Sequence, residues 1–445
     1  MSDFPSSKYE RGKIFARTGI RVGTNYAKHY LKRSMKRNGE KAEVDDKLNE
    51  LHGENAREVF KEFSKLRGTA LKIAQSLSMD QGLMPEAYTE VLSQAQYKVP
   101  PINKALVRTI IKRELGDYPE KIFDKFEPEA FAAASIGQVH RAWLKDGRKV
   151  AVKIQYPNVR DTINTDLRMA RLLLKRIIKG NNLDEYIDEV GERLMEETDY
   201  DHEGNQIERF ARHYNTDRYV TPRWIKELST RKVLTMSFVE GRHMKEFLAE
   251  KPSQEQRNHF GQLMWDFFHD QIKSKGPIHA DTHPGNFLFL EDGRLGIIDF
   301  GCVKSFPTRF YYDYLKLLPL HMKQDMEQIH ELYIDLEMLH RNPKNPEKEK
   351  EFFKFCKQYG DAFSEPYLEN QFDFGDESYR ERMNYYAREL PMWNEARGSR
   401  HFLYSTRVHL GLYSLLMRLK AQINTTESRQ IALQSVNTDQ IKTAG

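Results

Sequence analysis

The chain has 445 residues, with 70 Lys and Arg against 65 Asp and Glu, and a formal net charge of +5. Hydrophobic residues make up 39% of it, which allows two or three domains with sizeable cores and excludes a disordered protein. The small charge excess gives no reason to expect a nucleic-acid partner, and two cysteines exclude a disulfide framework. Neither a signal peptide nor an apolar run of ~18 residues is found, so we expect a cytoplasmic protein, at most peripheral to a membrane.

Residues 1–39 form a basic segment, with ten Lys and Arg between positions 8 and 37. Apolar residues such as Phe15, Ile20 and Tyr26 lie among these cations. The mixture fits an amphipathic helix at an anionic membrane surface, and it equally fits an arm docked on the protein itself.

Residues 40–105 are predicted to be helical, because apolar residues recur there at helical intervals until Pro100 and Pro101 end the pattern. Within this region Lys72 and Gln75 are three residues apart and share one helical face. From this spacing alone, a solvated pair is the commoner interpretation.

Residues 131–155 combine an alanine-rich loop with a predicted hairpin that turns at Gly147 and carries Lys153 on its second strand. A lysine within an apolar strand is costly unless it meets a carboxylate or a phosphate, or unless it faces outward on an edge strand. A kinase would have glycines in the preceding loop, and alanine disfavours the positive φ angles that glycine adopts. The sequence therefore predicts an atypical nucleotide loop at Ala132, Ala133, Ala134 and Ser135.

Residues 159–213 are also predicted to be helical and contain an acidic stretch with Glu197, Asp199 and Glu203. Acidic residues on a helix are most often solvated, but Glu203 is a candidate partner for Lys153.

Residues 231–241 are predicted to form a buried strand that ends at a glycine turn, where a kinase-like fold would connect its two lobes. Met236 would then lie beside the adenine, and backbone groups from Ser237 to Val239 would offer hydrogen bonds to it. Further along the sequence, residues 306–424 are predicted to be rich in helix.

The strongest motif runs from His279 to Gly301 and matches H-x-D-x-x-x-x-N followed by D-F-G. In this pattern Asp281 orients or deprotonates a nucleophile, while Asn286 and Asp299 hold Mg²⁺ against nucleotide phosphates. The intervening residues predict a short hairpin turning at Asp292 and Gly293, which brings Asn286 and Asp299 to the same end.

Together these segments resemble the UbiB (AarF) family of atypical protein-kinase-like proteins. The resemblance is carried, in family order, by KIAQSLS, LMPEAYTEVLSQAQYKVPP, AAASIGQVHRA, VAVKIQYP, EETDYDHEGNQ, HADTHPGNF and IDFG. It implies an α+β, bilobal kinase-like fold with a helical N-terminal extension at 40–105, an N-lobe at 106–239 and a helix-rich C-lobe at 240–445.

The resemblance also implies roles. Lys72 and Gln75 belong to the extension, which covers the place of a protein substrate, and Glu197 and Asp199 form its acidic partner. Lys153 and Glu203 would form the ion pair, with ATP and Mg²⁺ as cofactors. The implied activity is ATP hydrolysis or phosphorylation of a lipid or quinone-precursor-like molecule in support of isoprenoid-quinone biosynthesis.

Two departures and two alternatives stand beside this interpretation. The Lys-x-Gly-Gln motif of the family is Lys72-Ile73-Ala74-Gln75 in this sequence, with alanine in place of glycine. Many bacterial relatives end in paired transmembrane helices, and this sequence does not. The alternatives are a kinase for a small soluble alcohol and a nucleotide-binding scaffold for biosynthetic enzymes. The extension argues against the first, and retention of the full set of catalytic residues argues against the second.

Overall fold

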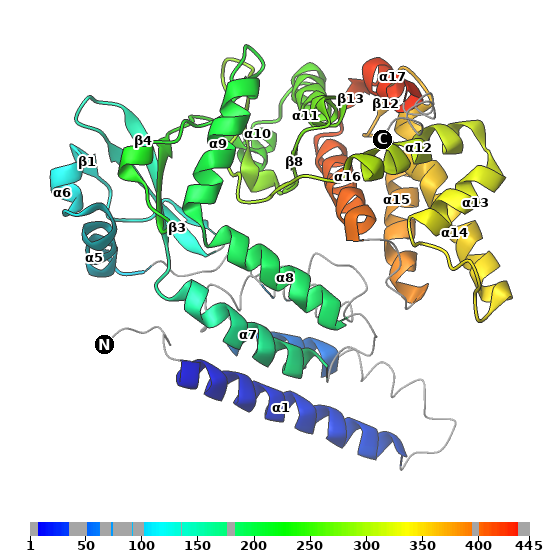
Figure 1. Ribbon diagram of the computed structural model, residues 1–445, viewed down its shortest axis with the longest axis horizontal. Coiled ribbons are helices and arrows are strands. Elements are labelled where there is room, and N and C mark those ends of the chain that lie inside the picture. The colour runs from blue at the N-terminus through cyan, green and yellow to red at the C-terminus, as the bar shows by residue number, and fades with distance from the viewer. Residues whose placement is uncertain are drawn as a thin grey trace. The chain divides into compact units, whose positions relative to one another are not determined.

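The computed structural model describes residues 8–34, 51–62, 73, 91, 102–134, 136–175, 183–393 and 400–434. Its contacts divide the chain into two compact units (Figure 1). Unit 1 comprises residues 1–205 and 223–238, and unit 2 comprises residues 206–222 and 239–445. The predicted mixture of helices and strands is confirmed.

Unit 1 is built on an antiparallel sheet in the order β1-β3-β4-β6, with β2 paired to β3. The strands span β1 (Lys125–Phe126), β2 (Ala132–Ala134), β3 (Gly137–Trp143), β4 (Lys149–Gln155) and β6 (Val233–Ser237). The turn between β3 and β4 contains Gly147 at φ +87°, as the sequence predicts. Because β4 lies between two neighbours, its residues from Val150 onward are all buried.

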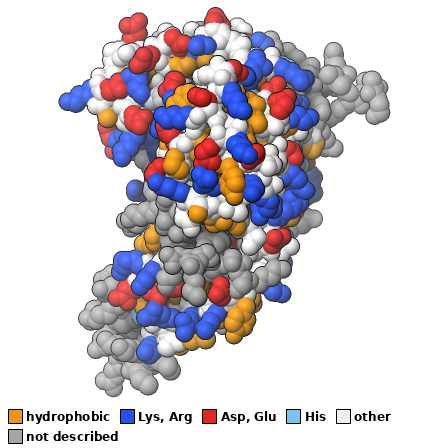
Figure 2. All heavy atoms as spheres, turned by 90° about the vertical axis from the view of Figure 1, so that its left-hand side faces the viewer, with side chains coloured by type: hydrophobic (Ala, Val, Ile, Leu, Met, Phe, Trp, Pro, Cys, Tyr) orange, Lys and Arg blue, Asp and Glu red, His pale blue; other side chains and the backbone are white. Residues whose placement is uncertain are grey.

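The helices that begin in unit 1 include α1 (Lys8–Ser34), α5 (Lys104–Leu115), α6 (Pro119–Ile122), α7 (Val159–Leu174), α8 (Leu183–Glu197), α9 (Tyr200–Tyr214) and the 3₁₀ turn η3 (Lys226–Leu228). Residues 51–62 are helical as well. Asn103 caps α5, since its side chain accepts a hydrogen bond from the Leu106 amide, and Gly116 ends that helix at φ +91°. Helix α9 starts in unit 1 and ends in unit 2. In Figure 2, basic and acidic side chains are interspersed over the face shown.

The basic segment forms helix α1, which packs along α7. Phe15 is 3% and Tyr26 9% exposed, and both belong to the core of unit 1. Tyr26 also contacts the Nδ1 atom of His52 at 2.6 Å, and Asn25 donates a hydrogen bond to Asn55 at 2.7 Å. Phe15 and Tyr26 are therefore docked on the protein in this structure and are not available to a lipid interface.

Unit 2 contains a second sheet in the order β5-β10-β9-β7 and two further strand pairs, β8 with β11 and β12 with β13. The strands span β5 (Tyr219–Val220), β7 (Arg242–His243), β8 (Ile278–His279), β9 (Phe287–Phe289), β10 (Leu295–Ile297), β11 (Val303–Lys304), β12 (Gln371–Asp373) and β13 (Gln422–Asn424). The hairpin β9-β10 turns at Gly293, φ +87°, which confirms the prediction.

The helices of unit 2 span α10 (Met244–Ala249), α11 (Gln254–Ser274), α12 (Thr308–Lys323), α13 (Met326–Asp335), α14 (Pro346–Ser364), α15 (Glu377–Glu389), α16 (Arg400–Leu419) and α17 (Thr426–Gln434), with 3₁₀ turns η4 (Pro284–Asn286), η5 (Glu365–Tyr367) and η6 (Leu390–Trp393). In this unit, α16 and α17 pack against α11, whose apolar side chains are buried, while α12, α13 and α14 pack against one another. No helix of the described residues is long and apolar enough to span a bilayer.

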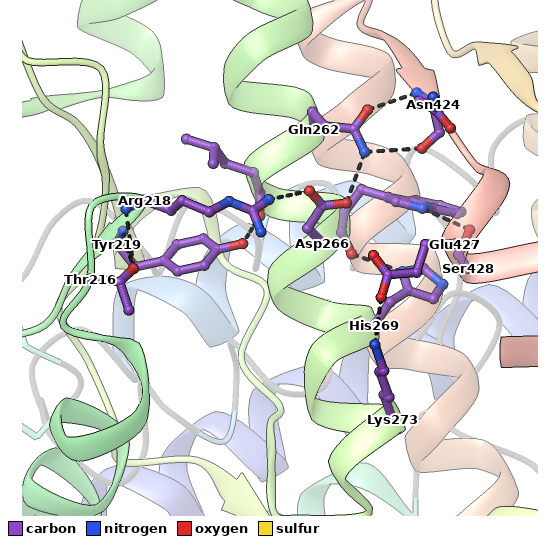
Figure 3. A network of polar contacts seen from close by, with 12 residues as sticks. Thr216, Arg218, Tyr219, Gln262, Asp266, His269, Lys273, Asn424, Glu427 and Ser428 are labelled. Carbon is purple, nitrogen blue, oxygen red and sulfur yellow. Dashed lines mark hydrogen bonds and ion pairs between the residues drawn. The ribbon is translucent and has the colours of Figure 1, made fainter. Parts of the chain in front are cut away.

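Polar contacts attach the C-terminal elements to α11 (Figure 3). Gln262 donates a hydrogen bond to the Asn424 carbonyl at 3.0 Å and accepts one from the Asn424 amide at 2.7 Å. The Trp265 indole donates to Ser428 at 3.0 Å, and Lys273 pairs with Glu427 at 2.6 Å. Strand β13 and helix α17 are thereby integral parts of unit 2.

Candidate functional site

The central polar feature of unit 1 is an ion pair between β4 and α9. The Lys153 ammonium lies 2.8 Å and 2.9 Å from the two carboxylate oxygens of Glu203. The two side chains are only 8% and 4% exposed, and the Tyr200 ring centroid lies 5.2 Å from the ammonium. Such a pair stabilises both charges in the interior, and removing one partner typically costs 3–5 kcal/mol. Sequence reasoning named both ionic partners but did not single out Tyr200.

The alanine-rich segment lies in an extended strand. Ala132, Ala133 and Ala134 form β2 and pair with Val139, Gln138 and Gly137 of β3. None of the three alanines has a positive φ angle. Ser135, the remaining member of the predicted loop, lies outside the described residues.

The single glycine of this motif, Gly137, is required by close packing. A Cβ atom there would lie 2.3 Å from the Ile154 carbonyl oxygen and 2.9 Å from the Tyr200 hydroxyl. Because backbone atoms of β4 occupy that space, any larger residue would push β3 away from the strand that carries Lys153.

A buried hydrogen-bonded chain joins β3 to the start of α5. Gln138 accepts a hydrogen bond from the Ile102 amide at 2.8 Å, and its side-chain nitrogen lies 2.8 Å from His140 Nε2. His140 Nδ1 lies 2.9 Å from the Glu127 carbonyl, which requires the proton on Nδ1 and makes Nε2 the acceptor. Burial lowers the pKa of His140, an effect that the hydrogen bond to Glu127 opposes.

The segment predicted to meet the adenine follows β6. Met236 is 8% exposed and pairs with Ala151 of β4. The Ser237 amide already donates to Arg223, and the Phe238 amide donates to Lys149. Those two amides are engaged within unit 1, so a nucleotide base would have to use other backbone groups of this segment, up to Val239.

The three polar residues of the second motif lie around the β9-β10 hairpin and the loop before it. Asn286 directly precedes β9, and its carbonyl accepts the Ile298 amide at 3.0 Å, next to Asp299. The Asn286 side-chain nitrogen donates to the Asp281 carbonyl at 3.1 Å. The hairpin thus brings Asn286 and the residue before Asp299 together, as its geometry predicts.

Asn286 and Asp299 offer the oxygen donors that Mg²⁺ prefers. With the Asn286 nitrogen engaged by Asp281, its oxygen is directed away from that contact, and Asp299 supplies a carboxylate. Mg²⁺ prefers oxygen ligands and is usually held by one or two such side chains together with substrate phosphates. Among the described residues, no group of three or more His, Cys, Asp or Glu could hold a metal ion.

Aromatic packing fixes the backbone at Asp299. His279 Nε2 lies 2.7 Å from the Asp299 carbonyl oxygen, and the His279 ring lies 5.5 Å from that of Phe300. Phe210 from the second half of α9 packs on Phe300 at 5.0 Å. The side-chain oxygen of Asp299 in turn accepts the Gly301 amide at 3.0 Å. The H-x-D and D-F-G segments are therefore joined within unit 2.

The acidic stretch before α9 has a local structural role. Asp199 accepts a hydrogen bond from the His202 amide at 3.3 Å, as a helix cap does, and pairs with Arg231 at 2.9 Å. Glu197 is the last residue of α8. Lys72 and Gln75 lie outside the described residues, so their predicted contact with Glu197 and Asp199 stays a prediction.

Comparison with known proteins identifies the family. The ABC1 atypical kinase-like domain matches residues 94–333. The probable serine/threonine-protein kinase abkA of Dictyostelium discoideum is 27% identical over 445 residues, covering 95% of this chain and 78% of that protein. The atypical kinase COQ8, mitochondrial, of Saccharomyces cerevisiae is 32% identical over 294 residues, covering 64% of this chain and 58% of that protein.

The fold is also similar to a solved structure, that of Rv3197 from Mycobacterium tuberculosis in complex with erythromycin. Its TM-score is 0.59 at 27% identity, over 88% of this chain and 98% of that chain. The predicted bilobal kinase-like fold is thereby confirmed. The family match covers more than half of the sequence and includes the Lys153–Glu203 pair and the H-x-D and D-F-G segments. The chain therefore belongs to the ABC1 (UbiB/AarF) family of atypical kinase-like enzymes.

Proposed function

We propose that the protein binds Mg-ATP and either hydrolyses it or transfers its γ-phosphate to a small or lipid-like molecule. The observation that carries this proposal is the buried Lys153–Glu203 pair, with 2.8 Å and 2.9 Å contacts. A lysine held in the interior by one carboxylate is positioned to meet the negative charge of nucleotide phosphates.

In this proposal each residue has one task. Lys153 pairs with the phosphates, and Glu203 holds its ammonium in place. Asp281 orients or deprotonates the attacking hydroxyl or water, and Asn286 and Asp299 hold Mg²⁺. The metal neutralises charge that develops on the transferred phosphoryl group. In the sheet, Val139 lies opposite Lys153, and Ala151 lies opposite Met236. These side chains therefore share one face of the sheet, on which we place the adenine.

The proposed physiological role is support of isoprenoid-quinone biosynthesis, with a lipid or quinone-precursor-like acceptor. Biosynthetic enzymes and an anionic membrane surface are the proposed partners. This part is supported by the resemblance to the UbiB family. The extension with Lys72 and Gln75 would exclude protein substrates, so intact protein should not phosphorylate generic protein substrates.

The test is release of ADP with Mg²⁺, with and without liposomes and phenolic quinone-precursor analogues, together with Mg²⁺-dependent nucleotide affinity. Asp299→Asn should nearly abolish that affinity, because a principal charge on the metal is lost. Asp292→Asn is the matched control: this exposed carboxylate pairs with Arg294 at the hairpin turn. Unchanged affinity in Asp299→Asn would refute the site, whereas tight binding without ADP release would favour the scaffold alternative.

A further inference from the structure

The helix that carries Glu203 is attached to the sheet of unit 1 at its N-terminal end. The Tyr200 amide donates to the Arg231 carbonyl at 3.2 Å, and Asp199 pairs with the Arg231 side chain at 2.9 Å. Arg231 lies two residues before the start of β6, the strand paired with β4. The start of α9 and the strand bearing Lys153 are thus joined through one short connection.

A second attachment lies one residue beyond Glu203. Gly204 packs against the indole of Trp224, and a Cβ atom at Gly204 would lie 2.3 Å from Cε2 and 2.6 Å from Cδ2 and Nε1. Trp224 itself forms a β-bridge with Met236 in β6. The atoms that would be struck belong to a rigid ring, so a larger residue could be accommodated only by moving α9 or the tryptophan.

Glycine is unfavourable inside a helix relative to alanine, and Gly204 does not have a positive φ angle that would require it. Space against Trp224 is therefore the structural reason for a glycine at this position. Restoring an ordinary carbon–carbon contact after adding a methyl group requires a displacement of roughly 1 Å. A displacement of that size next to Glu203 would take its 2.8 Å and 2.9 Å contacts out of hydrogen-bonding range.

We propose that Gly204 and Trp224 are positioning residues, which set the depth at which α9 docks so that Glu203 reaches Lys153 without a ligand or partner. The proposal deepens the proposed function, because it explains how the phosphate-pairing lysine is held ready. It concerns contacts within unit 1 and depends on no ligand geometry.

The test measures the rate at which Lys153 is acylated by an amine-reactive ester, read by peptide mass spectrometry with the exposed Lys145 as internal reference. Lys153 should react slowly in the parent. Gly204→Ala should raise its rate by about tenfold, because loss of the Glu203 pair lets the Lys153 side chain react whenever the site opens locally. Adding Trp224→Leu to Gly204→Ala removes the ring from the path of the methyl group and should return the rate toward that of the parent.

Gly12→Ala is the matched control, since it is the same change inside helix α1 at a glycine whose Cβ would meet nothing within 4 Å. It should leave Lys153 labelling unchanged. A folded Gly204→Ala protein with parental Lys153 labelling would overturn the proposal. If Gly204→Ala alone does not fold, its effect is measured in the Trp224→Leu background. There Gly204→Ala must change Lys153 labelling by less than about twofold, and any larger increase contradicts the positioning role of Gly204 and Trp224.

Mg-ATP affinity is then measured on the same proteins. It should fall in Gly204→Ala, where labelling rises, and recover in the double variant, where labelling returns toward the parental rate. Absence of Mg-ATP binding by the parent would refute the proposed function and leave the labelling result standing. Altered labelling with unaltered nucleotide affinity would overturn the positioning role while leaving nucleotide binding intact. The two failures are therefore distinguishable.

Discussion

Acidification should destabilise unit 2 through a buried histidine on α11. His269 Nδ1 lies 2.8 Å from the Trp265 carbonyl, so that nitrogen carries the proton, and Nε2 accepts from the Tyr367 hydroxyl at 2.8 Å. Tyr367 also contacts His409 Nε2 at 3.1 Å, and His409 Nδ1 contacts Tyr314 at 2.9 Å. When both histidines are neutral, each of these four hydrogen bonds has one donor and one acceptor.

Burial lowers the pKa of His269 from 6.5 to about 4, an effect that the Trp265 hydrogen bond opposes. Burial likewise lowers the pKa of His409, with the neighbouring His269 adding to the effect. At acidic pH the unfolded protein binds protons that the folded protein excludes. The stability that depends on neutral His269 and His409 is therefore fully present above pH 6.5 and is lost as the pH falls toward 4. For His269 alone, the free energy of unfolding should decrease by about 2 kcal/mol between pH 7.5 and pH 5.

The assay is hydrogen exchange of peptides from α11 at the two pH values, corrected for intrinsic exchange rates. His269→Gln should be less stable at pH 7.5, but its opening free energy should change by about 2 kcal/mol less between the two pH values than that of the parent. His213→Gln, at an exposed histidine outside this chain of hydrogen bonds, serves as the control. Identical pH dependence in His269→Gln and the parent would refute the reasoning.

Three further predictions concern the site and its surroundings. Ala133→Gly should raise Mg-ATP affinity by freeing β2 from its extended conformation, and titration calorimetry showing parental affinity would remove this strand from the mechanism. Gly411→Ala places a Cβ 1.8 Å from the Thr282 hydroxyl in the H-x-D loop, so steady-state ADP release should fall about tenfold or more with little change in nucleotide affinity, and parental turnover would contradict this. Ile20→Asp, on the exposed face of α1, should weaken co-sedimentation with anionic vesicles without lowering the melting temperature, and equal binding by parent and variant would leave α1 as a docked arm.

The local elements could be predicted from sequence because short-range chemistry determines them. Both hairpins follow from a glycine turn between β-forming residues, and Gly147 and Gly293 adopt the positive φ angles that such turns need. The pairing of Lys153 with Glu203 could be proposed only from motif order, since 50 residues separate them. Their contact depends on how α9 packs, which no local pattern encodes.

Other features were beyond sequence reasoning for identifiable reasons. A basic amphipathic helix has the same pattern whether its apolar face meets lipid or protein, so the docking of α1 through Phe15 could not be decided. A glycine inside a helix indicates close approach but does not name the approaching residue, which is Trp224 for Gly204. The hydrogen-bond partner of buried Gln138 could not be predicted, because the alternation of apolar and polar residues along a strand indicates which face a side chain lies on but not what it contacts.

The attachment of β13 and α17 to α11 has a consequence for how the protein is made. Gln262 meets its backbone partners on Asn424 across a separation of 162 residues, so α11 is synthesised long before the strand that completes its polar edge. Contacts this distant in sequence form slowly, because a long loop must close before they contribute. During translation α11 therefore lacks its β13 and α17 contacts until the last described segment has been made, and we expect α11 to be prone to aggregation in the nascent chain until then.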